Sequence, residues 1–247
     1  MNLGLTDRVA LVTGGAAGIG AAIAVTLARE GCAIAIVDRT GEAPGPLEAI
    51  QALGRPVRIL AADVRDHAAA GRIVDEVIHE FGRLDILVCS AGITDDATIA
   101  RMSEEQWDRV LAVNLKGCFN YTQAAARHFV AQKGGRIINI ASINGLRGKL
   151  GQANYAASKG GMIAMSKSAA RELGRFNVNV NVVAPGMVLT EMTRVLPAEV
   201  LARAMDETVL GRLATVEDCA DLVAFLCSER ARHITGEVIQ VDGGQYI

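Results

Sequence analysis

The sequence predicts an α/β fold in which one domain, residues 1–247, forms a doubly wound parallel sheet of about seven strands with helices on both faces. Short apolar runs rich in β-branched residues alternate with longer segments of helical period, as expected for repeated strand–helix units. Most of these runs are continuously apolar, which is typical of strands buried on both faces. No low-complexity linker or internal repeat divides the chain.

The expected strands lie, in order, at residues 9–13, 33–38, 57–63, 84–92, 136–142, 178–186 and 238–244. Helices are expected near residues 18–30, 42–54, 67–82, 103–130, 152–174 and 215–228. In a sheet of this kind, ligands bind beyond the carboxyl ends of the strands. The run VNVNVVAPG is unusual, because Asn alternates with Val in a way that burial on both faces does not explain.

The charge balance argues against two classes of partner. The chain has 25 Lys and Arg against 27 Asp and Glu, a formal net charge of −2, with the two signs interspersed. Without a basic field, neither nucleic acid nor an anionic membrane is expected to bind. No apolar run approaches the roughly 18 residues that span a bilayer. Because the first residues lead almost directly into an expected strand, we expect an unexported, cytoplasmic protein.

The cysteines are expected to be reduced core residues, since free cysteine is usually buried. Their number is odd, and the sequence contains no CxxC pair and no His/Cys cluster. Both facts argue against a disulfide framework, and the second argues against a metal site. The residues are Cys32, Cys89, Cys118, Cys219 and Cys227.

A glycine-rich turn, VTGGAAGIGAAIA, joins the first expected strand to the first expected helix. Glycines let the backbone turn sharply and approach a pyrophosphate, and the helix that follows directs free N–H groups at the anion. The turn therefore predicts a dinucleotide site, and the alternative is a turn that serves packing alone. The candidate residues are Gly14, Ala17, Gly18, Ile19 and Gly20.

Asp38, at the end of the second expected strand, favours NAD(H) as the cofactor. Its carboxylate could accept hydrogen bonds from the adenosine ribose hydroxyls and would repel a 2′-phosphate. Arg39 could meet that phosphate, so NADP(H) is the alternative. The TGxxxGxG spacing of the turn resembles the short-chain dehydrogenase/reductase family, whose NADP-preferring members usually carry a basic residue at the position of Ala17.

Three further segments match this family and extend the expected cofactor site. ADV at 62–64 resembles the adenine-side contact, CSAG at 89–92 stands in place of the usual NNAG, and APGMVLT at 184–190 resembles the segment that passes the nicotinamide. A strand-ending turn is the alternative for the Pro-Gly pair. The resemblance indicates Asp63, Val64, Ala91, Gly92, Pro185, Gly186, Val188 and Thr190.

Tyr155 and Lys159 lie four residues apart in GQANYAASKGG, so on a helix they share one face. A free phenol has a pKa near 10, and a neighbouring cation together with a positively charged nicotinamide would stabilise its phenolate. Both residues are therefore candidates for catalysis and for cofactor binding. On an ordinary helix, such a pair usually means one packed ring and one solvated charge.

Asn114 and Ser142 complete, with this pair, a match to the family's catalytic tetrad in order and approximate spacing, within a resemblance that runs from residue 7 to residue 244. It implies a Rossmann-type fold in which Ser142 bonds the substrate oxygen and Tyr155 exchanges the proton. It also implies that Lys159 lowers the phenol pKa and holds the nicotinamide ribose, while Asn114 positions a water. The alternatives are a strand-end cap for Ser142 and backbone hydrogen bonding for Asn114.

Within the family, the chain looks most like the 3-oxoacyl-(acyl-carrier-protein) reductases of fatty acid biosynthesis, on the segments GQANYAASKGG, NVVAPGMVLTEMTR and ITGEVIQVDGG. This implies an acyl-thioester ketone substrate and acyl carrier protein as a partner. The segment beyond Gly186 could close over such a substrate, or it could be an ordinary surface helix. Its apolar side chains include Met187, Leu189, Met192, Val195, Leu196 and Met205.

Carrier docking would need basic residues beside the site, because the carrier is acidic. Phe176 stands where a basic residue would help, and the NAD preference fits a catabolic enzyme better. The alternatives are an NAD-dependent dehydrogenase of another secondary alcohol, polyol or hydroxysteroid, and a non-catalytic NAD-binding regulator. The basic candidates, each of which also fits a solvated face, are Lys133, Arg136, Arg147 and Arg175.

The expected helices at 103–130 and 152–174 carry broad faces of small residues that could pack against a partner subunit. The family resemblance implies a homotetramer with two-fold symmetry. Burial of the same faces inside one subunit is the alternative.

Overall fold

In a computed structural model, seven parallel strands form one sheet in the order β3-β2-β1-β4-β5-β6-β7. The structure describes residues 3–247, apart from the side chains of residues 192 and 194. The order reverses between β1 and β4, which confirms the doubly wound sheet. The strands are β1 Val9–Thr13, β2 Ala33–Asp38, β3 Val57–Ala61, β4 Ile86–Cys89, β5 Gly135–Ile140, β6 Val178–Pro185 and β7 Val238–Val241.

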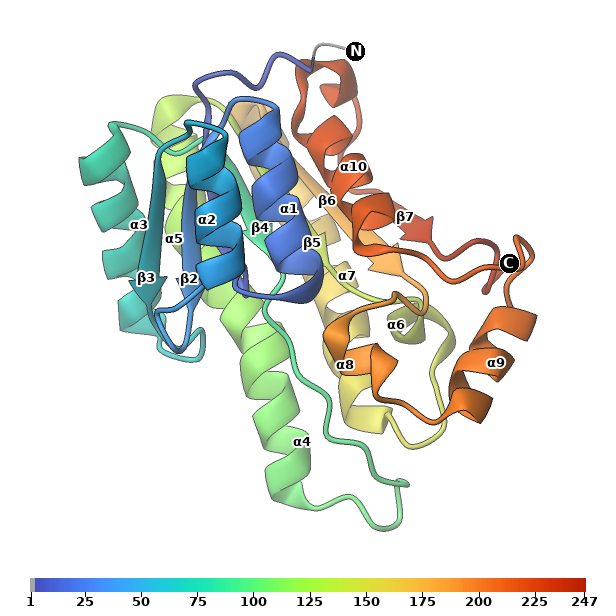
Figure 1. Ribbon diagram of the computed structural model, residues 1–247. Helices are drawn as coiled ribbons and strands as arrows, with labels where there is room; N and C mark the ends of the chain where they lie inside the picture. Colours follow the sequence, from blue (N-terminus) through green and yellow to red (C-terminus); the bar gives the residue numbers. More distant parts are fainter. Residues whose placement is uncertain (1–2) are drawn as a thin grey trace.

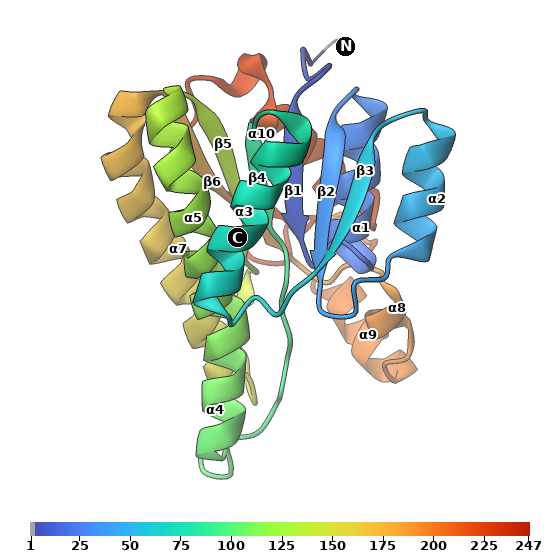
Figure 2. The same cartoon turned by 90° about the vertical axis from the view of Figure 1, so that its left-hand side faces the viewer.

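Helices cover both faces of the sheet (Figures 1 and 2), and each face has its own apolar core. The first face carries α1 Gly18–Arg29, α2 Pro44–Ala52 and α10 Val216–Cys227. The second carries α3 His67–Phe81, α5 Gly117–Gln132 and α7 Ala153–Leu173. The expected helix at 103–130 is built from α4 Glu104–Leu111, a π-helical turn Ala112–Lys116 and α5.

Three short helices that the sequence did not predict individually lie beyond the carboxyl ends of β5 and β6 (Figure 1). They are α6 Asn144–Arg147, α8 Glu191–Arg194 and α9 Ala198–Asp206, and 3-10 turns occur at Gly174–Phe176 and Glu229–Ala231. Thr190 caps α8, because its side chain accepts a hydrogen bond from the backbone N–H of Thr193. These helices follow the strands that carry the candidate site, so they can cover its substrate end.

Hydrogen bonds to the segment that leads into β7 explain the alternation of Asn with Val in β6. The Asn179 side chain donates to the carbonyl oxygens of Arg232 and Ile234, at 3.0 and 2.9 Å, and Asn181 donates to that of Ile234 at 2.8 Å. Asn181 also accepts from the N–H of Glu237 at 3.2 Å. Buried amides thus satisfy backbone groups that lack a strand partner beside the edge strand.

The cysteine prediction is confirmed, since all five are unpaired and buried. Among residues 3–247, no group of three or more His, Cys, Asp or Glu side chains is arranged to hold a metal ion. No helix in this part of the chain is long and apolar enough to cross a membrane.

Candidate active site

A cavity of about 870 Å³ opens at the carboxyl ends of the strands. All the residues that the sequence indicated for cofactor binding line it, from Gly14 after β1 to Thr190 after β6. Ser142, Tyr155 and Lys159 line it as well. Asn114 does not belong to the lining. The ends of parallel strands share one edge of the sheet, so distant segments converge here.

The glycine turn after β1 depends on the absence of side chains. Gly14 has φ 64°, and a Cβ on it would lie 2.7 Å from the Cα of Ala91. A Cβ on Gly20 would lie 2.2 Å from the carbonyl oxygen of Gly14. Ala17 precedes α1 without capping it by a side chain, so the first N–H groups of the helix remain available to a pyrophosphate.

Charged side chains gather where the cavity reaches β2 and β3. Asp38 and Arg39 line this part, and the Asp38 carboxylate accepts long hydrogen bonds, of 3.4 Å, from the backbone N–H and the hydroxyl of Thr40. Asp63 pairs with Arg65 at 2.6 Å, and hydrogen bonds from the Arg65 side chain lower the pKa of the carboxyl. Sequence reasoning missed Arg65, which also lines the cavity.

Tyr155 and Lys159 lie on one face of α7, as predicted, with the Lys159 Nζ 5.7 Å from the centroid of the phenol ring. Lys159 is buried, and its ammonium donates to the carbonyl oxygen of Ile140 at 2.7 Å. Burial lowers the pKa of Lys159 to about 8. A neutral amine therefore becomes accessible near physiological pH.

The pKa of Tyr155 shifts in the direction opposite to the one expected from Lys159. Burial raises it, a hydrogen bond from Ser142 lowers it, and the negative charge of Asp96 raises it. The Ser142 hydroxyl thus favours the ionised phenol, and burial opposes it.

Asn114 belongs to the π-helical turn and is fully buried. Its Oδ1 accepts from the Ile93 N–H at 2.8 Å, and its Nδ2 donates to the Ile93 carbonyl at 3.0 Å and to the Ser158 hydroxyl at 3.1 Å. A Cβ on Gly92 would lie 3.4 Å from the Asn114 Oδ1 and 3.5 Å from the Lys159 Nζ. Through its hydrogen bonds, the Asn114 amide satisfies both backbone groups of Ile93 and contacts the Ser158 hydroxyl, one residue before Lys159.

Three polar residues beside Tyr155 were not indicated by the sequence analysis. Gln152 donates to Asp96 at 2.8 Å and accepts from Asn144 at 3.0 Å, and all three line the cavity. The backbone N–H of Asn144 donates to the Ser142 hydroxyl at 3.1 Å. No spacing in the sequence relates Asp96 to the other two, since a contact between two loops brings them together.

The basic residues suggested for carrier docking do not surround the cavity of the same subunit. Arg136 is buried and pairs with Glu229, so that suggestion was wrong for this residue. Lys133 and Arg175 precede β5 and β6, at the amino ends of the strands, whereas the cavity lies at the carboxyl ends. Arg147 does line the cavity, but it is paired with Glu207.

The apolar segment beyond Gly186 contributes to the cavity in part. Met187, Val188 and Leu196 line it, together with Val200 from α9. Val195 is 83% exposed, and the Met192 side chain lies outside the described residues. The segment therefore gives the cavity an apolar part of its lining, beside Thr190, Glu191 and Thr193 from the same segment.

Comparisons with known proteins assign the class. The family model described as enoyl-(acyl carrier protein) reductase matches residues 14–245. A solved structure of a short-chain alcohol dehydrogenase from Sinorhizobium meliloti is similar, with a TM-score of 0.94 and 35% identity over 97% of this chain and 96% of that one. The chain belongs to the short-chain dehydrogenase/reductase family and is an enzyme of that class.

Among the most similar relatives are two groups with different names. The 3-oxoacyl-(acyl-carrier-protein) reductase FabG of Thermotoga maritima is 41% identical over 98% of this chain and 99% of its own length. The (3R)-3-hydroxyacyl-CoA dehydrogenase of Mus musculus is 45% identical over 99% of this chain and 98% of its own. Both names describe chemistry at the third carbon of an acyl thioester.

Proposed function

We propose that this enzyme reduces 3-oxoacyl thioesters with a nicotinamide cofactor, and in reverse oxidises 3-hydroxyacyl thioesters. The observation that carries the proposal is that Ser142, Tyr155 and Lys159 line the same cavity as the glycine turn after β1 and Asp38. Relatives of nearly equal length that carry both names support the acyl thioester as the substrate class. Dehydrogenation of another secondary alcohol is the alternative within the same chemistry.

In this proposal, a bound reduced nicotinamide supplies the hydride. Tyr155 donates its proton to the ketone oxygen as negative charge develops there, and Ser142 donates a hydrogen bond to the same oxygen. Lys159 holds the cofactor ribose and adds positive charge beside the phenol when it is protonated. Asn114 acts on the site through the backbone of Ile93, and we retain a water beside it as a hypothesis.

NAD(H) is the cofactor that we favour, because Asp38 lines the cavity at the end of β2 and its carboxylate is held only by long bonds from Thr40 among residues 3–247, so it can accept from ribose hydroxyls. Arg39 and Arg65 line the same region, so NADP(H) is the second candidate. Initial rates with both cofactors distinguish them.

The decisive experiment is a panel assay with NADH and NADPH. Its substrates are acetoacetyl-CoA, an acetoacetyl carrier-protein thioester and simple ketones, with secondary alcohols in the oxidative direction. Turnover of the thioesters in preference to the ketones supports the proposal, and a preference for the carrier form identifies acyl carrier protein as a partner. Cofactor binding without turnover of any member would instead support a non-catalytic NAD-binding regulator.

We also propose a homotetramer and a cytoplasmic location. The small-residue surfaces of α5 and α7 support the first, and five unpaired cysteines support the second, since thiols remain reduced in that compartment. Light scattering measures the assembly, and a monomeric mass in solution would reject the tetramer.

A further inference from the structure

Arg147, at the end of α6, joins three segments that are far apart in the sequence. Its Nη1 and Nη2 each donate to the Glu207 carboxylate at 3.2 Å, just after α9. Its Nη1 also donates to the Gln245 carbonyl at 3.3 Å, and its Nε to the Asn144 side chain at 3.2 Å. All three guanidinium nitrogens bond to protein oxygens, so Arg147 acts as a junction inside the protein.

Gln245 extends this junction to the segment that passes the nicotinamide position. Its Nε2 donates to the Glu207 carboxylate at 3.1 Å, and its Oε1 accepts from the Met187 N–H at 3.0 Å. The bonds from Gln245 and Arg147 lower the pKa of Glu207, which keeps this carboxylate charged. A Cβ on Gly186 would lie 2.6 Å from the Gln245 Oε1, so the tail after β7 packs directly against this glycine.

The tail also holds the end of the segment that contains α8 and α9. The Leu210 N–H donates to the Gly243 carbonyl at 3.1 Å. A Cβ on Gly243 would lie 2.6 Å from the Thr208 side chain, and one on Gly244 would lie 2.9 Å from that of Val209. This close packing means that a movement of residues 207–210 requires a movement of the tail.

On its other side, the junction reaches Ser142, and through Gln152 it reaches Asp96. Asn144 bonds Arg147 through its side chain, and it donates to Gln152 through the side chain and to Ser142 through the backbone. Gln152 in turn donates to Asp96, whose charge acts on the pKa of Tyr155. A continuous series of hydrogen bonds therefore runs from Asp96 to the N–H of Met187, through Gln152, Asn144, Arg147, Glu207 and Gln245.

We propose that Arg147, Glu207 and Gln245 form a latch that holds residues 187–211 closed over the substrate end of the cavity and thereby sets the affinity for the ketone substrate. They are positioning residues, because they act through the loop of Ser142 and the wall formed by Met187. The position of residues 187–211 is supported by the contacts of Arg147, Glu207 and Gln245. The effect of this position on the affinity for a ketone rests on the proposed function. A substrate then binds tightly only when the wall is held in this position.

The test compares the wild type with Glu207→Gln, Arg147→Met and the double variant. Each single variant is expected to raise the KM for acetoacetyl-CoA about tenfold, with kcat within about twofold and the Kd of NADH unchanged. The double variant should be no worse than the worse single one, because both changes remove one interaction. Arg58→Met is the matched control, since it removes exposed ion pairs with Glu76 and Glu80 and Arg58 does not line the cavity.

Hydrogen exchange tests the latch without relying on turnover. In Glu207→Gln, amides of residues 187–189, 207–211 and 242–247 should exchange about fivefold faster than in the wild type, and those of α3 should not. Unchanged exchange in these segments would overturn the latch, whatever the kinetics. Faster exchange with an unchanged KM would overturn the role of the latch in substrate affinity. If the wild type reduces no thioester, the proposed substrate class is rejected, and the exchange result alone decides whether the latch exists.

Discussion

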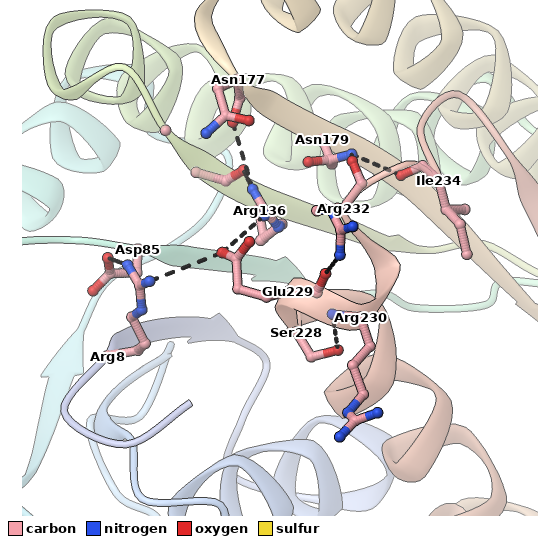
Figure 3. A network of polar contacts seen from close by, with 12 residues as sticks. Arg8, Asp85, Arg136, Asn177, Asn179, Ser228, Glu229, Arg230, Arg232 and Ile234 are labelled. Carbon is pink, nitrogen blue, oxygen red and sulfur yellow. Dashed lines mark hydrogen bonds and ion pairs between the residues drawn. The ribbon is translucent and has the colours of Figure 1, made fainter. Parts of the chain in front are cut away.

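Buried charged side chains at the two ends of the central sheet have different partners. At the amino ends of the strands, Asp85 is 4% exposed and accepts hydrogen bonds from Arg8, at 3.0 Å, and from Arg83, at 2.8 Å. Nearby, the buried Arg136 donates to Glu229 at 3.2 Å (Figure 3). At the carboxyl ends, Lys159 is 3% exposed, and among residues 3–247 it bonds a carbonyl oxygen rather than a carboxylate.

We interpret the paired charges at the amino ends as stabilising the fold, and the charge of Lys159 as available to a ligand. An ion pair closed by partners on several sides compensates for the loss of hydration, and it leaves little electrostatic field to act on anything else. An ammonium that is buried without a carboxylate is destabilised, which its lowered pKa shows. Perturbed groups of this second kind cluster at functional sites.

Tyr155→Phe should have the largest effect, and it acts only at the carboxyl end. Removal of the phenol hydroxyl takes away the proton donor, so kcat for ketone reduction should fall about 10³-fold. The thermal midpoint and the NADH Kd should change little. Steady-state kinetics, fluorescence titration and thermal unfolding measure the three quantities, and near-normal turnover would show that another group supplies the proton.

Asp85→Ala should produce the converse result at the amino end. It leaves Arg8 and Arg83 without their shared carboxylate and the Val9 N–H without its acceptor, at a cost of about 3 kcal/mol in the free energy of unfolding. Below the unfolding transition, KM and kcat should match those of the wild type. Urea unfolding with kinetics at low temperature checks both points. If Asp85→Ala lost activity without losing stability, the amino end of the sheet would not have the purely structural role assigned to it here.

The pH dependence of stability tests the unpaired ammonium. The pKa of Lys159 is lowered to about 8 in the fold and has its ordinary value of 10.5 when the chain unfolds. Between these values the unfolded state binds more protons, so stability rises with pH. The free energy of unfolding of the wild type minus that of Lys159→Met should therefore increase by roughly 1–2 kcal/mol from pH 8 to 9.5. Urea titrations across this range measure it, and a flat difference would mean that Lys159 is not destabilised by burial.

Asp38→Ala should have the smallest effect, confined to the cofactor. The change removes repulsion of a 2′-phosphate and an acceptor for ribose hydroxyls, so the preference for NADH over NADPH should fall about tenfold. The ratio of kcat/KM for the two cofactors measures it. Arg58→Met, on the neighbouring strand β3, serves as the control, and an unchanged ratio in Asp38→Ala would refute the role assigned to this carboxylate.

The sequence located most of the candidate site because its residues follow strands. Gly14, Asp38, Ser142 and Gly186 each lie at or just after an expected strand, and parallel strands bring such positions to one edge. Side chains whose partners come from distant segments were missed or misjudged. Arg136 looked like a surface cation, but it lies in β5 between β4 and β6, where it is buried and donates to Glu229, 93 residues away.

What the sequence determined by itself is the repeated strand–helix order, the edge of the sheet that holds the site, and the tyrosine and lysine on one helical face. Local periodicity and turn chemistry encode all three. Only the tertiary structure decided that the tail after β7 contacts Gly186, that Arg147 joins α6 to the end of α9, and that burial raises the pKa of Tyr155. These depend on contacts across as many as 98 residues and on the degree of burial, and no local pattern in the chain specifies either of them.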